Sequence, residues 1–85
     1  MTLAAIAAAV VEFEAERGRA VAHVELGADA MAEVMAESRG MSVVMERDRA
    51  LVRVAGPSGP LNLAHNDRLC DHMIVVDTTG ERWPT

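Results

Sequence analysis

The chain has 85 residues, with thirteen carboxylates, eight arginines and no lysine, which give it a net charge of −5. Nucleic-acid binding needs a basic surface that neutralises phosphates, so this charge, with arginines dispersed along the sequence, argues against DNA or RNA as a partner. A lone cysteine cannot form an internal disulfide and is typical of a reducing cytoplasm, and the length predicts a single domain over residues 1–85.

The apolar segment 1–11 looks at first like a signal peptide. However, it lacks a basic leading region, and Glu12, Glu14 and Glu16 follow it at once. It is also far shorter than the roughly 20 residues that cross a bilayer. We therefore expect a helix of the mature protein over residues 3–17, ended by Gly18, in a cytoplasmic protein with no membrane partner.

One stripe of this expected helix is strongly apolar, with side chains spaced three and four residues apart: Leu3, Ile6, Val10 and Phe13. Alanines fill the other faces of its first two turns, so this half of the helix has no polar side for water. A chain of this length has little core to spare. We therefore predict a homo-oligomer in which this helix region contacts a second copy, with alanines such as Ala5 and Ala8 allowing close approach.

Residues 20–26 alternate in polarity and predict a half-buried strand. Gly27 then leads into a helix over about 28–38, which Gly40 ends. The expected inner stripe of this helix is Met31, Val34, Met35 and Ser38, and the outer stripe is Asp29, Glu33 and Glu37. Residues 41–46 follow as a strand, so 20–46 predicts a crossover unit whose two strands are parallel.

After a tight turn at Arg47 and Asp48, residues 49–55 alternate again and predict a strand antiparallel to 41–46. The segment 56–60, Gly-Pro-Ser-Gly-Pro, breaks regular structure, and we expect an irregular loop that continues to about residue 71. Residues 72–77 are the last expected strand. A turn at 78–81 and a tail follow, and Trp83 of this tail is expected to fold back onto the body.

These elements predict an α+β fold in the order αβαβββ, with a four-stranded mixed sheet and both helices packed on one face. The opposite face of the sheet is expected to carry Val21, His23 and Val44, together with Arg53 or Val75. That face would meet solvent or a partner.

The expected loop holds most of the chemically versatile side chains. Its residues His65, Cys70 and His72 could supply three zinc ligands, with Asp67 as a fourth. Zinc sites usually contain paired ligands such as Cys-x2-Cys, and this set has no such spacing. We therefore expect no metal, and we interpret these side chains as turn caps, with Cys70 as a small buried residue.

A catalytic reading of the same loop would make Cys70 a nucleophile with His65 or His72 as its base. No glycine-rich elbow or oxyanion loop accompanies this cysteine. The segment 56–60 lacks the Gly-Lys-Ser/Thr ending of a phosphate-binding loop, and its prolines remove amide donors. We assign no catalytic residue and no cofactor, and we expect that the chain is not an enzyme.

Two further surface patterns have a functional and a structural interpretation. The acidic stripe of the second helix, with Glu12 and Glu16, could imitate a nucleic-acid backbone, but such a stripe is usually the solvated face of a helix. Methionines at 31, 35, 41 and 45 suit an adaptable groove, but their spacing favours a place in the core.

The layout of the chain resembles small uncharacterised proteins encoded by actinobacteriophages. The resemblance lies in the Ala-rich first helix, the stretch Val24-Glu-Leu-Gly-Ala-Asp-Ala30, and the Val-rich strands around a Pro/Gly/Asn/Asp loop. Arginine in place of lysine, and valine in excess over isoleucine, are typical of a GC-rich gene. The resemblance implies an accessory protein that acts in the host cytoplasm through contacts rather than chemistry.

We therefore expect a non-enzymatic interaction protein that self-associates. Its role would be that of a phage-encoded modulator of a host protein or of a minor structural component. The alternative from another class is a small-ligand or metal-binding domain that uses the loop around residues 62–72.

Overall fold

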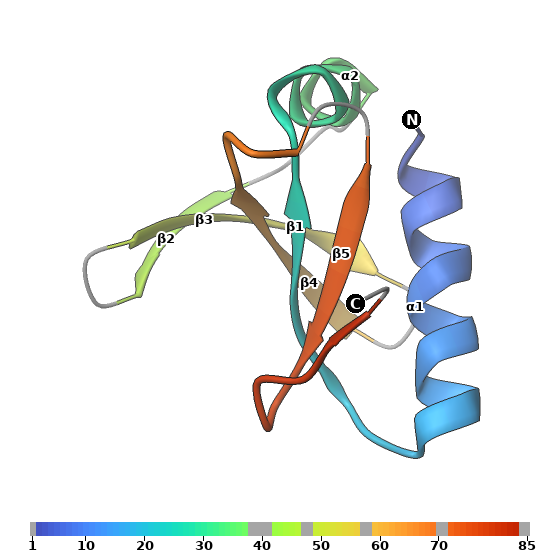
Figure 1. Cartoon of the computed structure of the whole chain (residues 1–85). Coiled ribbons are helices and arrows are strands. Elements are labelled where there is room, and N and C mark those ends of the chain that lie inside the picture. The colour runs from blue at the N-terminus through green and yellow to red at the C-terminus, as the bar shows by residue number, and fades with distance from the viewer. Residues whose placement is uncertain (1, 38–41, 47–48, 57–58, 70–71, 84–85) are drawn as a thin grey trace.

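The computed structural model describes residues 2–37, 42–46, 49–56, 59–69 and 72–83. It contains two helices and one mixed sheet, which confirms the α+β class, but the sheet has six strands rather than the expected four (Figure 1). The elements are α1 (Leu3–Arg17), β1 (Val21–Leu26), α2 (Ala28–Glu37), β2 (Ser42–Glu46), β3 (Arg49–Gly56), β4 (Gly59–His65), β5 (Met73–Asp77) and β6 (Arg82–Trp83).

Helix α1 begins and ends at well-formed caps. The Thr2 hydroxyl accepts a hydrogen bond from the Ala5 amide at 3.1 Å, which satisfies one of the free donors at the helix start. Gly18 adopts a left-handed conformation with φ of 63°, and its amide donates to the Glu14 carbonyl. The Leu3 amide also donates to the Glu37 carboxylate at 3.0 Å, so the start of α1 is joined to the end of α2.

The strand order is β2-β3-β4-β1-β5-β6. The central strand, β1, pairs parallel with β4 and antiparallel with β5. Strands β1 and β2 point the same way, as the expected crossover requires, but β3 and β4 lie between them. The antiparallel pairing of β2 with β3 agrees with the prediction, while the turn residues Arg47 and Asp48 lie outside the described residues.

Strand β4 is the main correction to the expected fold, because it occupies half of the segment that the sequence suggested was irregular. Pro60 lies at the second position of the strand, where a missing amide donor is tolerated. Leu61 and Leu63 then alternate toward the core. Gly56 pairs with Gly59, and a side chain on Gly56 would come within 2.8 Å of the Gly59 carbonyl oxygen, so this hairpin needs glycine there.

The second added strand, β6, is only two residues long and pairs with β5. It carries Trp83, which packs partly buried against the core with its ring 6.2 Å from that of Phe13. The prediction that Trp83 folds back onto the body is therefore confirmed, and the tail joins the sheet.

The core is one cluster drawn from both helices and one face of the sheet. It consists of Ile6, Val10, Phe13, Val24, Leu26, Ala30, Met31, Val34, Val54, Leu61, Leu63 and Val75. Val75 thus faces the core rather than the opposite face. Val21 also packs against the core, because the register shifts between Val21 and His23.

The expected inner stripe of α2 is wrong at Met35, which is 41% exposed. The helix turns Ala30, Met31 and Val34 toward the core. Successive residues are about 100° apart around a helix, so Met35 is carried toward solvent. Ser38 lies outside the described residues.

Candidate interaction surface

A buried carboxylate, Glu25, lies on the sheet face opposite the core, where its β4 neighbour is Ala64. The Arg82 guanidinium donates to both of its oxygens, at 2.7 and 2.8 Å, and Asn66 Nδ2 donates to Oε1 at 2.7 Å. His23 Nε2 lies 3.4 Å from Oε2. The Arg82 hydrogen bond is the main reason that the pKa of Glu25 falls to about 2.

This cluster is built for holding the fold together rather than for proton transfer. Glu25 joins the central strand to β6 through Arg82 and to the segment after β4 through Asn66. A carboxylate with a pKa near 2 is a weak base, and both of its oxygens already accept hydrogen bonds. We therefore interpret it as a structural pin between three segments that are distant in sequence.

A second buried carboxylate, Asp77, organises the turn between β5 and β6. It accepts hydrogen bonds from the amide and hydroxyl of Thr79, at 2.8 and 2.6 Å, from the Glu81 amide at 3.0 Å and from Arg19 at 3.0 Å. These bonds, the Thr79 hydroxyl first, hold the pKa of Asp77 well below its usual value. Arg17 and Arg19 both pair with Glu81.

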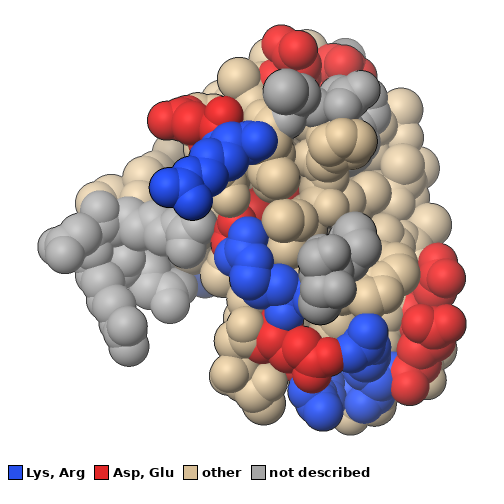
Figure 2. Space-filling view, in the orientation of Figure 1, with Lys and Arg blue, Asp and Glu red and all other residues tan. Residues whose placement is uncertain are grey.

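Figure 2 shows the consequence for the surface, where arginines lie next to acidic side chains instead of forming a basic field. Arg17, Arg19 and Arg82 each form an ion pair. The charges of these three arginines are therefore balanced by carboxylates of the same chain.

The described side chains of the expected 62–72 loop belong to different parts of the fold. Asn62 and His65 belong to β4, and His65 Nε2 lies 3.3 Å from an Asp67 oxygen. Among the described residues no three His, Cys, Asp or Glu side chains come together to hold a metal. Cys70 and Asp71 lie outside the described residues, so the zinc and nucleophile hypotheses stay hypotheses.

The apolar stripe of α1 packs against the core of its own chain. Ile6, Val10 and Phe13 are buried in the core, and Leu3 packs partly buried against it. These side chains are therefore not available to a second copy, and a contact through the alanine-rich side of this helix region stays a prediction. The face of α1 that remains exposed carries alanines, the acidic Glu12 and Glu16, and Val11, which is 50% exposed.

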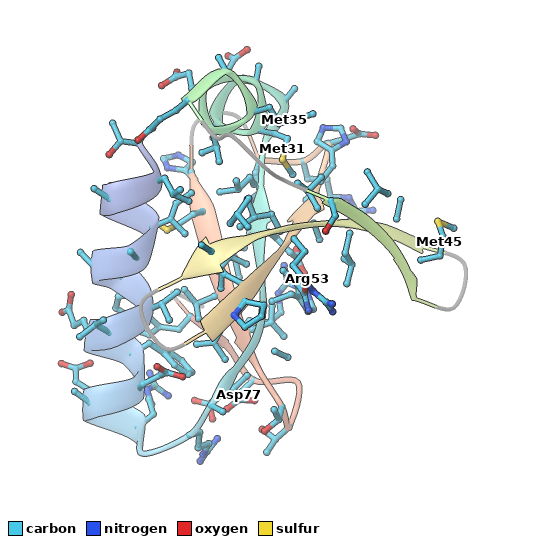
Figure 3. All side chains as sticks on the ribbon, turned by 180° about the vertical axis from the view of Figure 1, so that it is seen from behind. Met31, Met35, Met45, Arg53 and Asp77 are labelled. Atoms are coloured by element: carbon cyan, nitrogen blue, oxygen red, sulfur yellow. The ribbon has the colours of Figure 1, made fainter. Side chains whose placement is uncertain are left out.

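We call the paired residues 42–46 of β2 and 49–53 of β3 the arm. The arm carries the largest exposed apolar side chains of the described sheet. Val43 is 68% exposed and Met45 is 67% exposed. Val43 is opposite Val52, which is in turn opposite the core residue Leu63, so the arm continues the core face of the sheet. Figure 1 shows the arm extending away from α1, and Figure 3 shows Met45 far out on it, remote from Met31 and Met35.

A shallow hollow of about 420 Å³ lies at the base of the arm. Ser42, the first residue of β2, is opposite Arg53, so residues 54–56 of β3 extend beyond β2 and have no β2 neighbour. The hollow forms at this point. Ser42 and Arg53 are the polar side chains of its lining, which otherwise consists of valine, alanine, glycine and proline. The hollow is therefore a concave surface next to the arm, and its lining contains no acid–base pair.

Comparisons with protein-family models, with curated proteins and with solved structures found no match. No helix among the described residues is long and apolar enough to cross a membrane. The geometry of the arm is thus the main guide to function.

Proposed function

We propose that the chain is a small non-enzymatic interaction protein that associates with itself through the apolar face of the arm. The observation that carries this proposal is the exposure of Val43 and Met45, each more than two-thirds exposed on a strand that continues the core face. Fully burying a valine or methionine side chain stabilises by about 1.5–3 kcal/mol. A contact between two copies that covers part of this exposed area gains a fraction of this energy at each of four side chains, against the cost of association.

The buried polar groups support a contact function over a catalytic one. Glu25 and Asp77 both have strongly lowered pKa values, and both are occupied by hydrogen bonds that join segments of the fold. The adjacent hollow holds one charged side chain, Arg53, which already donates to Asn62 at 3.1 Å. These groups stabilise the body, and the exposed arm is left for a partner.

Light scattering over a range of protein concentrations tests this proposal. We expect a mass that rises from one chain to at least two as the concentration increases. A variant with Ala5→Glu and Ala8→Glu, both on the exposed side of α1, should associate as the wild type does. A single-chain mass at every concentration would contradict the proposal, and loss of association in the glutamate variant would move the contact to α1.

A further inference from the structure

The outer edge of β2 has the features of an open pairing site. β2 is the last strand on its side of the sheet, and no described strand pairs with its outer side. Its sequence, Ser-Val-Val-Met-Glu, contains no proline, and its single charged residue is at the end of the strand, so residues 42–45 lack the features that natural edge strands use to prevent pairing. The opposite edge, β6, is only two residues long. β2 is therefore the edge on which a further strand can be added.

Symmetry limits how two copies can join at this edge. Two β2 strands that pair antiparallel about a two-fold axis keep their core faces on the same side of the combined sheet. Side chains directly opposite each other share a face, so residues 43 and 45 must lie opposite residues 43 or 45. The arrangement centred on Val44 meets this condition and pairs all five residues of the strand.

We infer that two copies join β2 to β2 in this register, with Val44 opposite the partner's Val44, to form one continuous sheet. This inference rests on the proposed self-association and specifies its geometry. Outward-facing backbone groups of an edge strand belong to alternate residues. These are either the odd-numbered or the even-numbered residues of β2. In a register centred on one residue, odd-numbered residues lie opposite odd-numbered ones and even opposite even, so the outward-facing groups of the two copies meet.

The apolar rows across the junction are complementary in this register. Val43 lies opposite the partner's Met45, and Val52 flanks Val43 on β3. On the far side, the partner's Ala50 flanks the partner's Met45. The two-fold axis repeats this row, so both exposed apolar side chains of each arm meet an apolar neighbour.

The charges are complementary as well. Ser42 lies opposite the partner's Glu46, and the exposed Arg53 is the β3 neighbour of Ser42. By register, the partner's Glu46, whose neighbour on β3 of its own chain is Arg49, and Arg53 then lie on either side of Ser42 in one cross-strand row. In this register no two like charges of β2 lie directly opposite each other. A register centred on Glu46 would instead place the two Glu46 residues opposite each other. A second copy therefore extends the apolar row of the arm and places no like charges of β2 directly opposite each other.

Cysteine cross-linking tests the register, with Cys70→Ser present in every variant. Opposite residues in an antiparallel pair have Cα atoms about 4.5–5.5 Å apart, within the range that a disulfide spans. Diagonal neighbours are about 7–8 Å apart, which is beyond it. We expect Val44→Cys to form a disulfide-linked dimer in a glutathione buffer, and Val43→Cys to yield at least tenfold less. A mixture of Val43→Cys chains with Met45→Cys chains should give the mixed dimer.

The outcomes separate this inference from the proposed function. Equal cross-linking of Val43→Cys and Val44→Cys, or no mixed dimer in a sample that light scattering shows to be dimeric, would overturn the register while self-association stood. A chain that stays single at every concentration would overturn both. The mixed-dimer experiment uses two exposed positions, so it tests the register even if Val44→Cys fails to fold.

Discussion

At the β6 end of the sheet, buried carboxylates tie distant segments together, whereas at the β2 end two large apolar side chains stand in solvent. Glu25 and Asp77 are the buried charges of the first region, and each has several hydrogen-bond partners. In the described part of the chain no buried side-chain nitrogen or oxygen lacks a partner. Val43 and Met45, in contrast, continue the core face without a helix to cover them.

The difference separates the part of the chain that makes the fold stable from the part that we assign to contact. Both helices, strands β1, β4 and β5, and Val54 of β3 supply the core. The buried polar side-chain atoms of the described residues all have hydrogen-bond partners. The arm contributes exposed apolar area that a stable monomer does not need. Changes in the body should therefore alter the free energy of unfolding, and changes at the exposed side chains Val43 and Met45 should alter association.

The largest expected effect is on the body. Phe13 is fully buried, so Phe13→Ala should lower the free energy of unfolding by about 4 kcal/mol. Met45→Ala, at a position that is 67% exposed, should change it by less than about 0.5 kcal/mol in dilute protein. Urea denaturation at low concentration measures both. Similar losses for the two variants would show that the arm is part of the core.

The next largest effect concerns the pin at the β6 end. Glu25→Ala removes the acceptor of Arg82 and Asn66, but Arg82 is 45% exposed and can turn to water. We therefore expect a loss of about 2 kcal/mol in the free energy of unfolding. Glu12→Ala, at an exposed position of α1, serves as the control and should cost less than about 0.5 kcal/mol. Equal urea midpoints for both variants would refute the assigned role of Glu25.

The same pin should make stability depend on pH in the acid range. The pKa of Glu25 is about 2 in the folded chain against an ordinary 4.5, so unfolded chains bind a proton first. Its contribution is present above about pH 4.5 and is lost as the pH falls toward 2, and Asp77 acts in the same direction. Urea midpoints at pH 7, 4 and 3 should fall less steeply in Glu25→Gln, and an unchanged slope would count against this account.

How far the sequence predicts this fold is clearest at β4. Leu61 and Leu63 alternate as in a strand, but Gly59 and Pro60 precede them and indicate a break in regular structure. The strand was therefore missed, although proline is tolerated near the start of a strand. The six other described elements, α1, β1, α2, β2, β3 and β5, were predicted with ends within about one residue, since their periodicity or capping residues are local signals. β6 was missed because two residues carry no periodicity.

The candidate surface was less predictable than the elements. The sequence indicates that Val43 and Met45 lie on one face of a strand, but not that this strand is at the sheet edge, because strand order depends on distant pairings. The Glu25–Arg82 pair joins residues 57 positions apart and has no local signature. The apolar stripe of α1 is a local signal, but which strands it packs against is equally a long-range property.

The smallest expected effect is on nucleic-acid binding. Arg17, Arg19 and Arg82 are paired with carboxylates of the same chain, so we expect no salt-sensitive retention of duplex DNA or RNA. Gel-shift assays at micromolar protein and two salt concentrations measure this. A shift that disappears as salt is added would reveal a basic surface that the ion pairs do not neutralise.

The mass of two matched double variants tests the central claim most directly. Val43→Lys with Met45→Lys places like charges opposite each other in the proposed dimer, while Val11→Lys with Ala15→Lys adds the same charges to exposed positions of α1. At a concentration where the wild type is dimeric, sedimentation equilibrium should find the arm variant as a single chain and the α1 variant as a dimer. A dimeric arm variant beside a monomeric α1 variant would contradict the account and place the contact on the helix.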